Sequence, residues 1–128
     1  MTLQVALVVP DRELWSGTAS MVIAKTAEGD IGVLTGHSPV FGVLAEGSIA
    51  EIITDEQRVR AAVSGGFLSV ADDRVSILAA QAQLAGEINV ERTRQELAAA
   101  LAETAPGTED SPAVRYARAR LRAAGSQD

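Results

Sequence analysis

The stretch FLSVADDRVSIL, residues Phe67–Leu78, decides the fold expected for the first part of the chain. Apolar and polar side chains alternate on both of its arms, which is the period-two pattern of strands with one buried face. Asp72 and Asp73 lie between the arms, and short polar residues favour the tight turn of a β-hairpin. Gly65 and Gly66 break the chain before the first arm. The stretch therefore predicts an antiparallel pair of strands.

Four other segments show strand patterns, by alternation or by enrichment in β-branched and apolar residues. They are residues 3–9, 21–26, 47–54 and 58–63. Turn signals recur about every ten residues, which is typical of a β-sandwich or barrel. We therefore expect residues 1–86 to form an antiparallel β-sandwich or barrel domain.

The pattern changes after residue 86, where good helix formers dominate. Asn89 can cap a first helix, and a break follows over residues 106–112. Ser111 then offers a second capping hydroxyl directly before a proline, and Gly125 can end the second helix. Residues 87–128 are thus expected to form an αα-hairpin, which makes the fold class α+β.

The second predicted helix carries an apolar stripe at helical spacing. Its members are Val114, Ala117, Leu121 and Ala124. Because two of these four side chains are alanine, they bury little apolar area. We expect this stripe to dock the helical hairpin only loosely on the sandwich.

Composition excludes several classes of protein. The chain has 128 residues, no cysteine and one histidine, so disulfides and thiolate metal sites are excluded and a zinc site is disfavoured. The net charge of −6 argues against broad nucleic-acid binding. The N-terminus lacks the features of a signal peptide, and no apolar run approaches the ~18 residues of a membrane span. A soluble, cytoplasmic protein without direct membrane insertion is expected.

The stretch AEGDIGVLTGHSPVFG, residues Ala27–Gly42, concentrates glycines, two acids and the single histidine. A catalytic interpretation would make His37 a general base oriented by Glu28 or Asp30, but no well-placed nucleophile accompanies it. A phosphate loop would need a lysine or a following helix. The remaining interpretations are compatible: the glycines shape a loop, and its polar side chains contact a partner.

Three arginines share one face of the second helix, at spacings of three and four: Arg115, Arg118 and Arg122. A solvated basic face explains them simply. A short nucleic-acid-binding helix is an alternative, against which the acidic net charge weighs. An acidic protein partner is the third interpretation, because it would offset the repulsion between like charges on one helix face.

The motif EGDIGVLTGHSPV, the hairpin after Gly65-Gly66 and the terminal helices together resemble the epsilon subunits of bacterial F-type ATP synthases, in their actinobacterial form. The match covers nearly the whole chain, although Thr35 stands where the family commonly has proline. The resemblance implies a non-catalytic rotor subunit on the cytoplasmic face of the plasma membrane. Such a subunit couples the gamma subunit to the membrane rotor ring and regulates ATP hydrolysis through its C-terminal helices.

The resemblance also implies roles for particular residues. The ring of c subunits would be contacted by Glu28, Gly29, Asp30, Gly36 and His37, and the catalytic beta subunits by Arg115, Arg118 and Arg122. Some members bind ATP through a motif that matches here at Ile88, Asn89 and Arg92, with asparagine in place of the acid. Asn89 is equally well explained as a helix cap. We therefore expect ATP binding to be weak or absent, and no other cofactor.

One rival from another class stays open. The chain could be a stand-alone β-sandwich ligand-binding module with a helical tail. That interpretation predicts a deep apolar pocket and no affinity for the gamma subunit.

Overall fold

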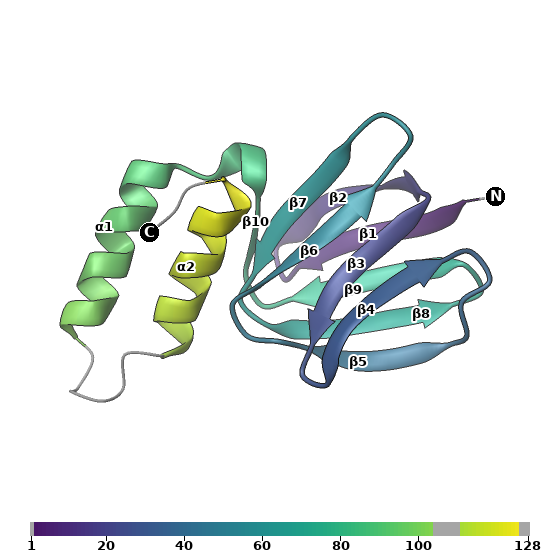
Figure 1. Cartoon of the computed structure of the whole chain (residues 1–128), viewed down its shortest axis with the longest axis horizontal. Coiled ribbons are helices and arrows are strands. Elements are labelled where there is room, and N and C mark those ends of the chain that lie inside the picture. The colour runs from purple at the N-terminus through teal and green to yellow at the C-terminus, as the bar shows by residue number, and fades with distance from the viewer. Residues whose placement is uncertain (1, 104–110, 126–128) are drawn as a thin grey trace.

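A computed structural model of the chain describes residues 2–103 and 111–125. Within these residues, strands come first and helices follow (Figure 1). The strands are β1 (Leu3–Val9), β2 (Arg12–Ala19), β3 (Met21–Thr26), β4 (Gly29–Leu34), β5 (Val40–Leu44), β6 (Ser48–Ile53), β7 (Arg58–Val63), β8 (Gly66–Ala71), β9 (Arg74–Ala79) and β10 (Ala82–Leu84). The helices are the 3-10 turn η1 (Ala85–Glu87), α1 (Val90–Ala102) and α2 (Pro112–Ala123). Most of the break predicted at residues 106–112 lies outside the described residues.

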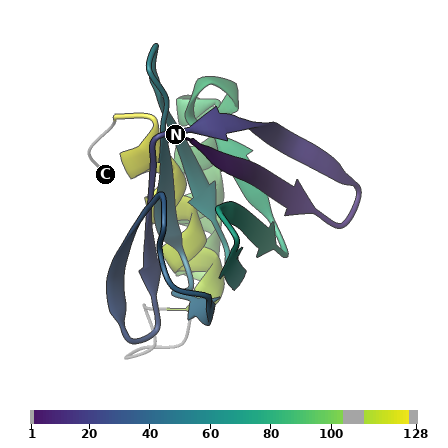
Figure 2. The same ribbon diagram turned by 90° about the vertical axis from the view of Figure 1, so that its right-hand side faces the viewer.

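The strands form two layers that face each other across the core. Hydrogen-bonded neighbours run β10-β7-β6-β3-β5-β8-β9-β1-β2, and β4 pairs with β3. The path changes layer between β3 and β5, which pair at Thr26 and Leu44. Figure 2 shows the β1–β2 hairpin directed away from the β3–β4 hairpin of the other layer. The predicted α+β class, with a β-sandwich followed by two helices, is confirmed.

One pairing departs from the antiparallel expectation, because β1 runs parallel to β9. These two strands are far apart in the sequence, so no tight turn fixes their relative direction. The hairpin predicted at residues 67–78 is confirmed as β8 and β9. Its turn residues, Asp72 and Asp73, have φ angles of 51° and 59°, which the left-handed turn of a two-residue hairpin requires.

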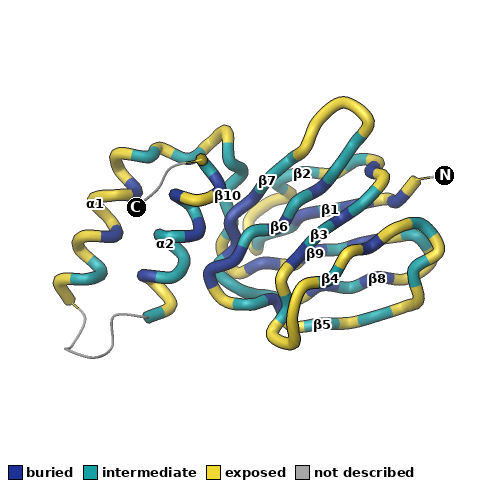
Figure 3. The backbone as a smooth tube through the Cα atoms, viewed as in Figure 1, coloured by how far each residue is buried: buried dark blue, intermediate teal, exposed yellow. Residues whose placement is uncertain are grey.

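The core lies between the layers and is filled by aliphatic side chains from both. The largest of them that are fully buried in the sandwich are Leu3, Leu7, Val22, Val33, Ile52, Val63, Leu68, Val70, Val75 and Ile77. They alternate along their strands with more exposed residues, as Figure 3 shows by colour. This packing fills the interior of the sandwich and gives no support to the rival expectation of a deep apolar pocket.

The predicted helix caps are confirmed. The side-chain oxygen of Asn89 accepts a hydrogen bond from the amide of Arg92 at 2.9 Å, which starts α1. The hydroxyl oxygen of Ser111 accepts one from the amide of Val114 at 3.3 Å, and proline occupies the first position of α2. Gly125, with φ of 83°, follows the end of α2.

Helix α2 lies between α1 and the sheet, and two of its faces are buried (Figure 1). Val114, Ala117 and Leu121 pack against Leu97 of α1. The expectation that this stripe docks on the sandwich is therefore wrong, and Ala124, its last member, is only half-buried. A helix packed between another helix and a sheet needs two apolar faces. The predicted stripe forms the face that packs against α1.

Candidate functional site

Of the two acids of the Ala27–Gly42 stretch, Glu28 lies in the turn between β3 and β4, and Asp30 is the second residue of β4. The hydroxyl of Thr26 donates to the carbonyl of Gly29 at 2.7 Å and accepts from the amide of Glu28 at 3.2 Å. These bonds close the turn with its own side chain. Glu28 and Asp30 stay exposed, and neither forms an ion pair within the described residues.

The histidine lies at the other end of β4. Its amide donates to the carbonyl of Leu34 at 3.1 Å, and its ring Nδ1 is 2.7 Å from the carbonyl oxygen of Ser38, to which it donates. The amide of Gly36, which has a φ of 81°, donates to a carboxylate oxygen of Asp73 at 2.7 Å. Groups of the chain itself therefore bond to the amides of Gly36 and His37 and to the Nδ1 of the histidine ring.

The expectation of one contiguous loop over Ala27–Gly42 is wrong. The stretch contains two strands, β4 and β5, because Ile31 and Val33 have the apolar side chains that let β4 pair with β3. The six residues of β4 span about 20 Å, at ~3.3 Å per residue, so the acids and His37 lie at opposite ends of it. Figure 1 shows the turns before and after β4 at these two ends. Glu28 and Asp30 are therefore too far away to orient the imidazole, and the catalytic interpretation that used them is not supported by the geometry.

An exposed apolar surface covers the outer side of β5, β8 and β9, and sequence reasoning missed it. We define this surface, the outer apolar face, as Phe41, Val43, Phe67 and Leu78. Phe41 is 67 % exposed and Phe67 is 45 % exposed, and their rings stack with centroids 5.4 Å apart. In register, Val43 lies opposite Phe67, and Phe67 lies opposite Leu78, which places all three on one side of the sheet.

The outer apolar face continues into a shallow cavity of about 430 Å³ beside Val8 and Ala80. Exposed apolar side chains that cluster on one face commonly mark a site of protein contact. A signal was present in the sequence, because Phe67 and Leu68 are adjacent and large. Neighbours in a strand point to opposite faces, so such a pair makes both faces apolar.

The second buried face of α2 docks on the outer side of the layer that contains β6 and β7. Ala119 and Ala123 pack on Ala62 of β7. At the turn before β6, a Cβ on Gly47 would lie only 2.5 Å from the backbone of Arg115. The small side chains and the glycine therefore let the helix backbone approach the sheet closely.

Two of the three predicted regulatory arginines contact the sandwich in this conformation. Arg115 lies 3.9 Å from the carboxylate of Glu46, and Arg122 donates to the carbonyl of Gly47 over 3.4 Å. Both contacts are long, and the Arg115 pair is partly exposed, so they add little stability. Arg118 is half-buried on the same helix. The predicted shared face is thus turned partly toward the turn before β6.

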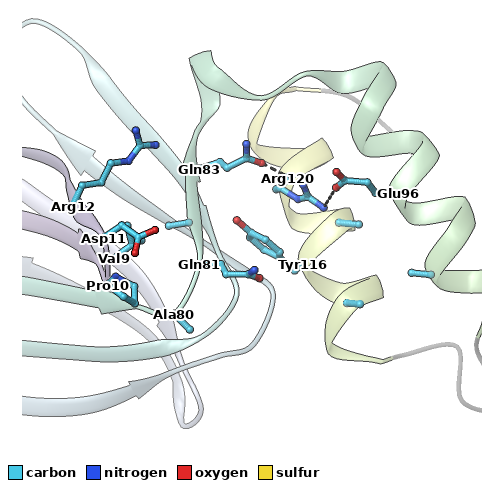
Figure 4. A pocket seen from close by; sticks show the side chains of 14 residues that line it. Val9, Pro10, Asp11, Arg12, Ala80, Gln81, Gln83, Glu96, Tyr116 and Arg120 are labelled. Carbon is cyan, nitrogen blue, oxygen red and sulfur yellow. Dashed lines mark hydrogen bonds and ion pairs between the residues drawn. The ribbon is translucent and has the colours of Figure 1, made fainter.

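A fourth arginine of α2, Arg120, contacts residues of three elements. Its guanidinium pairs with Glu96 of α1 at 2.7 Å, donates to Gln83 at 3.3 Å and lies 4.6 Å from the ring centre of Tyr116 (Figure 4). Its side chain is only 13 % exposed. These contacts tie α1, α2 and β10 together beside a cavity of about 840 Å³, into which Tyr116 points.

Burial shifts the ionisation of Tyr116. Removal from water disfavours the phenolate and raises the pKa above its ordinary value of 10.0. The nearby Arg120 opposes that shift by stabilising the phenolate, and Glu96 adds to it by repelling the phenolate.

Two residues of the degenerate nucleotide motif, Asn89 and Arg92, line a small cavity of about 310 Å³ next to that of Tyr116. Asn89 uses its side-chain oxygen as the helix cap, and the guanidinium of Arg92 pairs with Glu96 at 3.6 Å. Ile88 packs toward the contact of α2 with the sheet and is half-buried. Glu87 and Glu96 bring two carboxylates to this cavity, which repel a triphosphate.

Among residues 2–103 and 111–125, no group of three or more acidic or histidine side chains is arranged to hold a metal ion. None of the helices described is long and apolar enough to cross a membrane.

The chain is similar to known proteins over nearly its full length. The family model of the ATP synthase delta/epsilon chain, beta-sandwich domain, matches residues 2–85. The ATP synthase epsilon chain of Thermobifida fusca is 51% identical over 127 residues, covering 97% of this chain and 93% of the relative. The ATP synthase epsilon chain of Rhodococcus opacus is 48% identical over 120 residues, covering 93% of each.

A solved structure is similar as well. A chain in the cryo-EM structure of the Euglena gracilis mitochondrial ATP synthase, OSCP/F1/c-ring, matches with a TM-score of 0.70 and 25% identity. The match covers 94% of this chain and 75% of the other.

The environment of Tyr116 gives a first prediction. This is the only tyrosine of the chain, so a near-ultraviolet absorbance titration reports it alone. Because the pKa is raised in the folded state, the stability associated with the neutral phenol is complete below pH ~10 and falls as the pH rises through the folded pKa. Replacing Arg120 by methionine removes the cation that lowers the pKa and should shift the titration further up. A wild-type midpoint at or below the value in the unfolded chain would contradict this description.

Proposed function

The chain belongs to the ATP synthase delta/epsilon chain family, and from this membership we propose that it serves as a non-catalytic subunit of the rotor. In this role it joins the gamma subunit to the membrane rotor ring of c subunits and regulates ATP hydrolysis through its C-terminal helices. The observation that carries the proposal is the pairing of two surfaces on one chain. An exposed apolar face lies on one layer of the sandwich, and a helical hairpin is docked by small residues on the other.

We assign the outer apolar face to the gamma subunit. Stacked, half-exposed aromatic rings are the side chains that most often dominate the energy of a protein interface. A sheet face that remains in water usually carries polar side chains. The four large apolar side chains of the outer apolar face therefore favour a partner that covers them permanently. Membership of the ATP synthase supports a peripheral association with the membrane, and we propose that the chain lies on the cytoplasmic face of the plasma membrane.

Binding to recombinant gamma subunit tests this assignment. Replacing Phe67 by serine should weaken binding at least about tenfold, because it removes one ring of the stacked pair. The matched control is Leu34→Ser, which changes a 55 % exposed apolar side chain on β4, outside the face. Biolayer interferometry measures the affinity of each variant for the gamma subunit. An equal loss of affinity in the two variants would contradict the assignment.

We assign the ring contact to the β3–β4 turn and the start of β4, at Glu28, Gly29 and Asp30. The two carboxylates are exposed and can meet a polar loop of the ring. Gly36 and His37 were expected to share this contact, but they lie at the other end of β4 and bond to their own chain. If one end of the sandwich faces the ring, either Glu28 and Asp30 or Gly36 and His37 can contact it, but not both pairs.

Cysteine cross-linking in assembled membranes distinguishes the two ends. A cysteine at Asp30 should cross-link to cysteines in the polar loop of the c subunits, and a cysteine at His37 should not. The two variants are matched because Asp30 lies at the start of β4 and His37 lies just after its end. Cross-links from position 37 alone would reverse the orientation of the sandwich on the ring.

We infer that the hairpin regulates hydrolysis by exchanging between the docked state and one extended toward the catalytic beta subunits. Arg115, Arg118 and Arg122 would there meet acidic side chains of the beta subunit. Each exposed pair contributes only about 0.2–1 kcal/mol, so three together contribute about 0.6–3 kcal/mol and change a two-state ratio by roughly three- to 150-fold. The docked contact is small, which lets a bias of this size shift the populations.

Hydrolysis by the assembled enzyme should follow these populations. A chain ending at residue 104 lacks α2 and should raise ATP hydrolysis while assembly and proton coupling persist. Replacing Arg115, Arg118 and Arg122 by alanine should also raise it, and the difference from wild type should shrink as salt increases. Gly47→Ala should act in the opposite direction, because it disfavours the docked state. Unchanged hydrolysis in all three variants would leave the hairpin with a packing role only.

We also infer weak or absent binding of ATP at Ile88, Asn89 and Arg92. The asparagine side chain caps α1, and the arginine is paired with Glu96. Isothermal calorimetry with the full chain should therefore show no micromolar ATP binding that Arg92→Gln abolishes, and such binding would contradict the inference.

A further inference from the structure

A charged groove of about 500 Å³ opens on the outer side of β3, β6 and β7, beside α2. It is separate from the cavities lined by Arg92 and Tyr116, with which it shares no residue. Charged side chains of the sandwich and of α2 line it together. The cations are Lys25, Arg60, Arg115 and Arg122, and the acids are Asp30, Glu46 and Glu51.

Arg60 is the unusual member of this groove. Its Nε is buried and has no hydrogen-bond partner within the described residues. Glu51 lies directly opposite Arg60 in the register of β6 and β7, but its carboxylate bonds to Arg58 at 2.9 Å instead. A buried guanidinium donor left unsatisfied is costly, and an ion or a water commonly completes such a donor.

Two neighbours also have donors to spare. Lys25 lies opposite Asp30 in the register of β3 and β4, yet it forms no ion pair or side-chain hydrogen bond within the described residues. Arg122 uses one nitrogen for a long bond of 3.4 Å to the carbonyl of Gly47. Donors from β3, β7 and α2 are thus present along one groove.

We propose that this groove binds a phosphate group, held by Arg60, Arg122 and Lys25. A phosphate offers several acceptor oxygens and a negative charge, which match the planar fork of arginine and the point charge of lysine. It would complete the buried donor of Arg60 without displacing Glu51 from Arg58. Free phosphate and the phosphate chain of a nucleotide present the same chemistry.

The position of the groove links the ligand to the hairpin. Lys25 and Arg60 belong to the sandwich, whereas Arg122 belongs to α2. A phosphate held by all three stabilises the docked hairpin, and release of the hairpin lowers the affinity for phosphate by the same factor.

Isothermal calorimetry with the full chain tests the proposal, using inorganic phosphate, pyrophosphate and ATP at an ionic strength held constant with chloride. Phosphate should bind the wild type, and Arg60→Gln should weaken it at least about tenfold, as expected for a lost charge-assisted bond. Arg74→Gln, on β9 and outside the groove, is the matched control and should bind as the wild type does. Lys25→Gln changes an exposed side chain and provides a second variant that keeps the fold, with affinity lowered about threefold or more.

The ATP titration separates the two sources of phosphate. We expect the affinities for ATP and pyrophosphate to agree within about threefold and both to be lowered by Arg60→Gln. That result would show that the groove recognises the phosphate groups and not the nucleoside. ATP binding that is lost in Arg92→Gln and kept in Arg60→Gln would place the ligand in the other cavity and overturn the proposal. Equal phosphate binding by wild type and Arg60→Gln, or no binding above chloride, would also overturn it.

Discussion

The close approach of α2 to the turn at Gly47 determines where the helical hairpin lies. A Cβ at this position would be 2.5 Å from Arg115, and Gly47 also has a φ of 63°, in the region that glycine favours. Beyond the turn, Ala62 meets Ala119 and Ala123. Because these side chains are small, the contact buries little apolar area, and its strength depends on how well the backbones fit.

The contacts within the hairpin differ from those that hold it to the sandwich. Inside the hairpin, Arg120 and Glu96 form a short ion pair at 2.7 Å, and Leu97 packs among the apolar side chains of α2. Toward the sandwich, the ion pair of Arg115 with Glu46 is long and partly exposed. The contacts between α1 and α2 are thus stronger than the contacts of the hairpin with the sandwich. The hairpin can therefore leave the sandwich as one unit, which is the property that the proposed regulation requires.

The sequence predicted the elements whose pattern is local. Alternation identified the hairpin at residues 67–78, and Asn89, Ser111 and Gly125 marked helix ends through bonds to near neighbours. It missed β4 and β5, because glycines at positions 32, 36 and 42 made the stretch resemble a loop while pairing with β3 and β8 organised it. The outer apolar face was not predicted either. Its residues come from β5, β8 and β9, and only the pairing register of these strands brings them together.

Tertiary contacts likewise decided what the arginines do. Spacing on α2 grouped Arg115, Arg118 and Arg122 correctly on one face, but it could not show that Gly47 and Glu46 lie beneath that face. Arg120 was one of four arginines in the pattern, and its role depends on Glu96 and Gln83, which are distant in sequence. The boundary at residue 86 remains a prediction of the sequence.

The most direct test asks whether the absence of a side chain at Gly47 is what allows the helical hairpin to dock on the sandwich. Spin labels at Ala98 of α1 and Asp55 of the β6–β7 turn, both exposed, report the distance between hairpin and sandwich by pulsed electron resonance. The wild type should give one narrow distribution, whereas Gly47→Ala should broaden and lengthen it, since the clash and the strained backbone cost about 1–3 kcal/mol. Gly86→Ala is the control, because a Cβ there meets no atom within 4 Å. A Gly47→Ala distribution identical to the wild type, with the sandwich still folded by circular dichroism, would contradict the account.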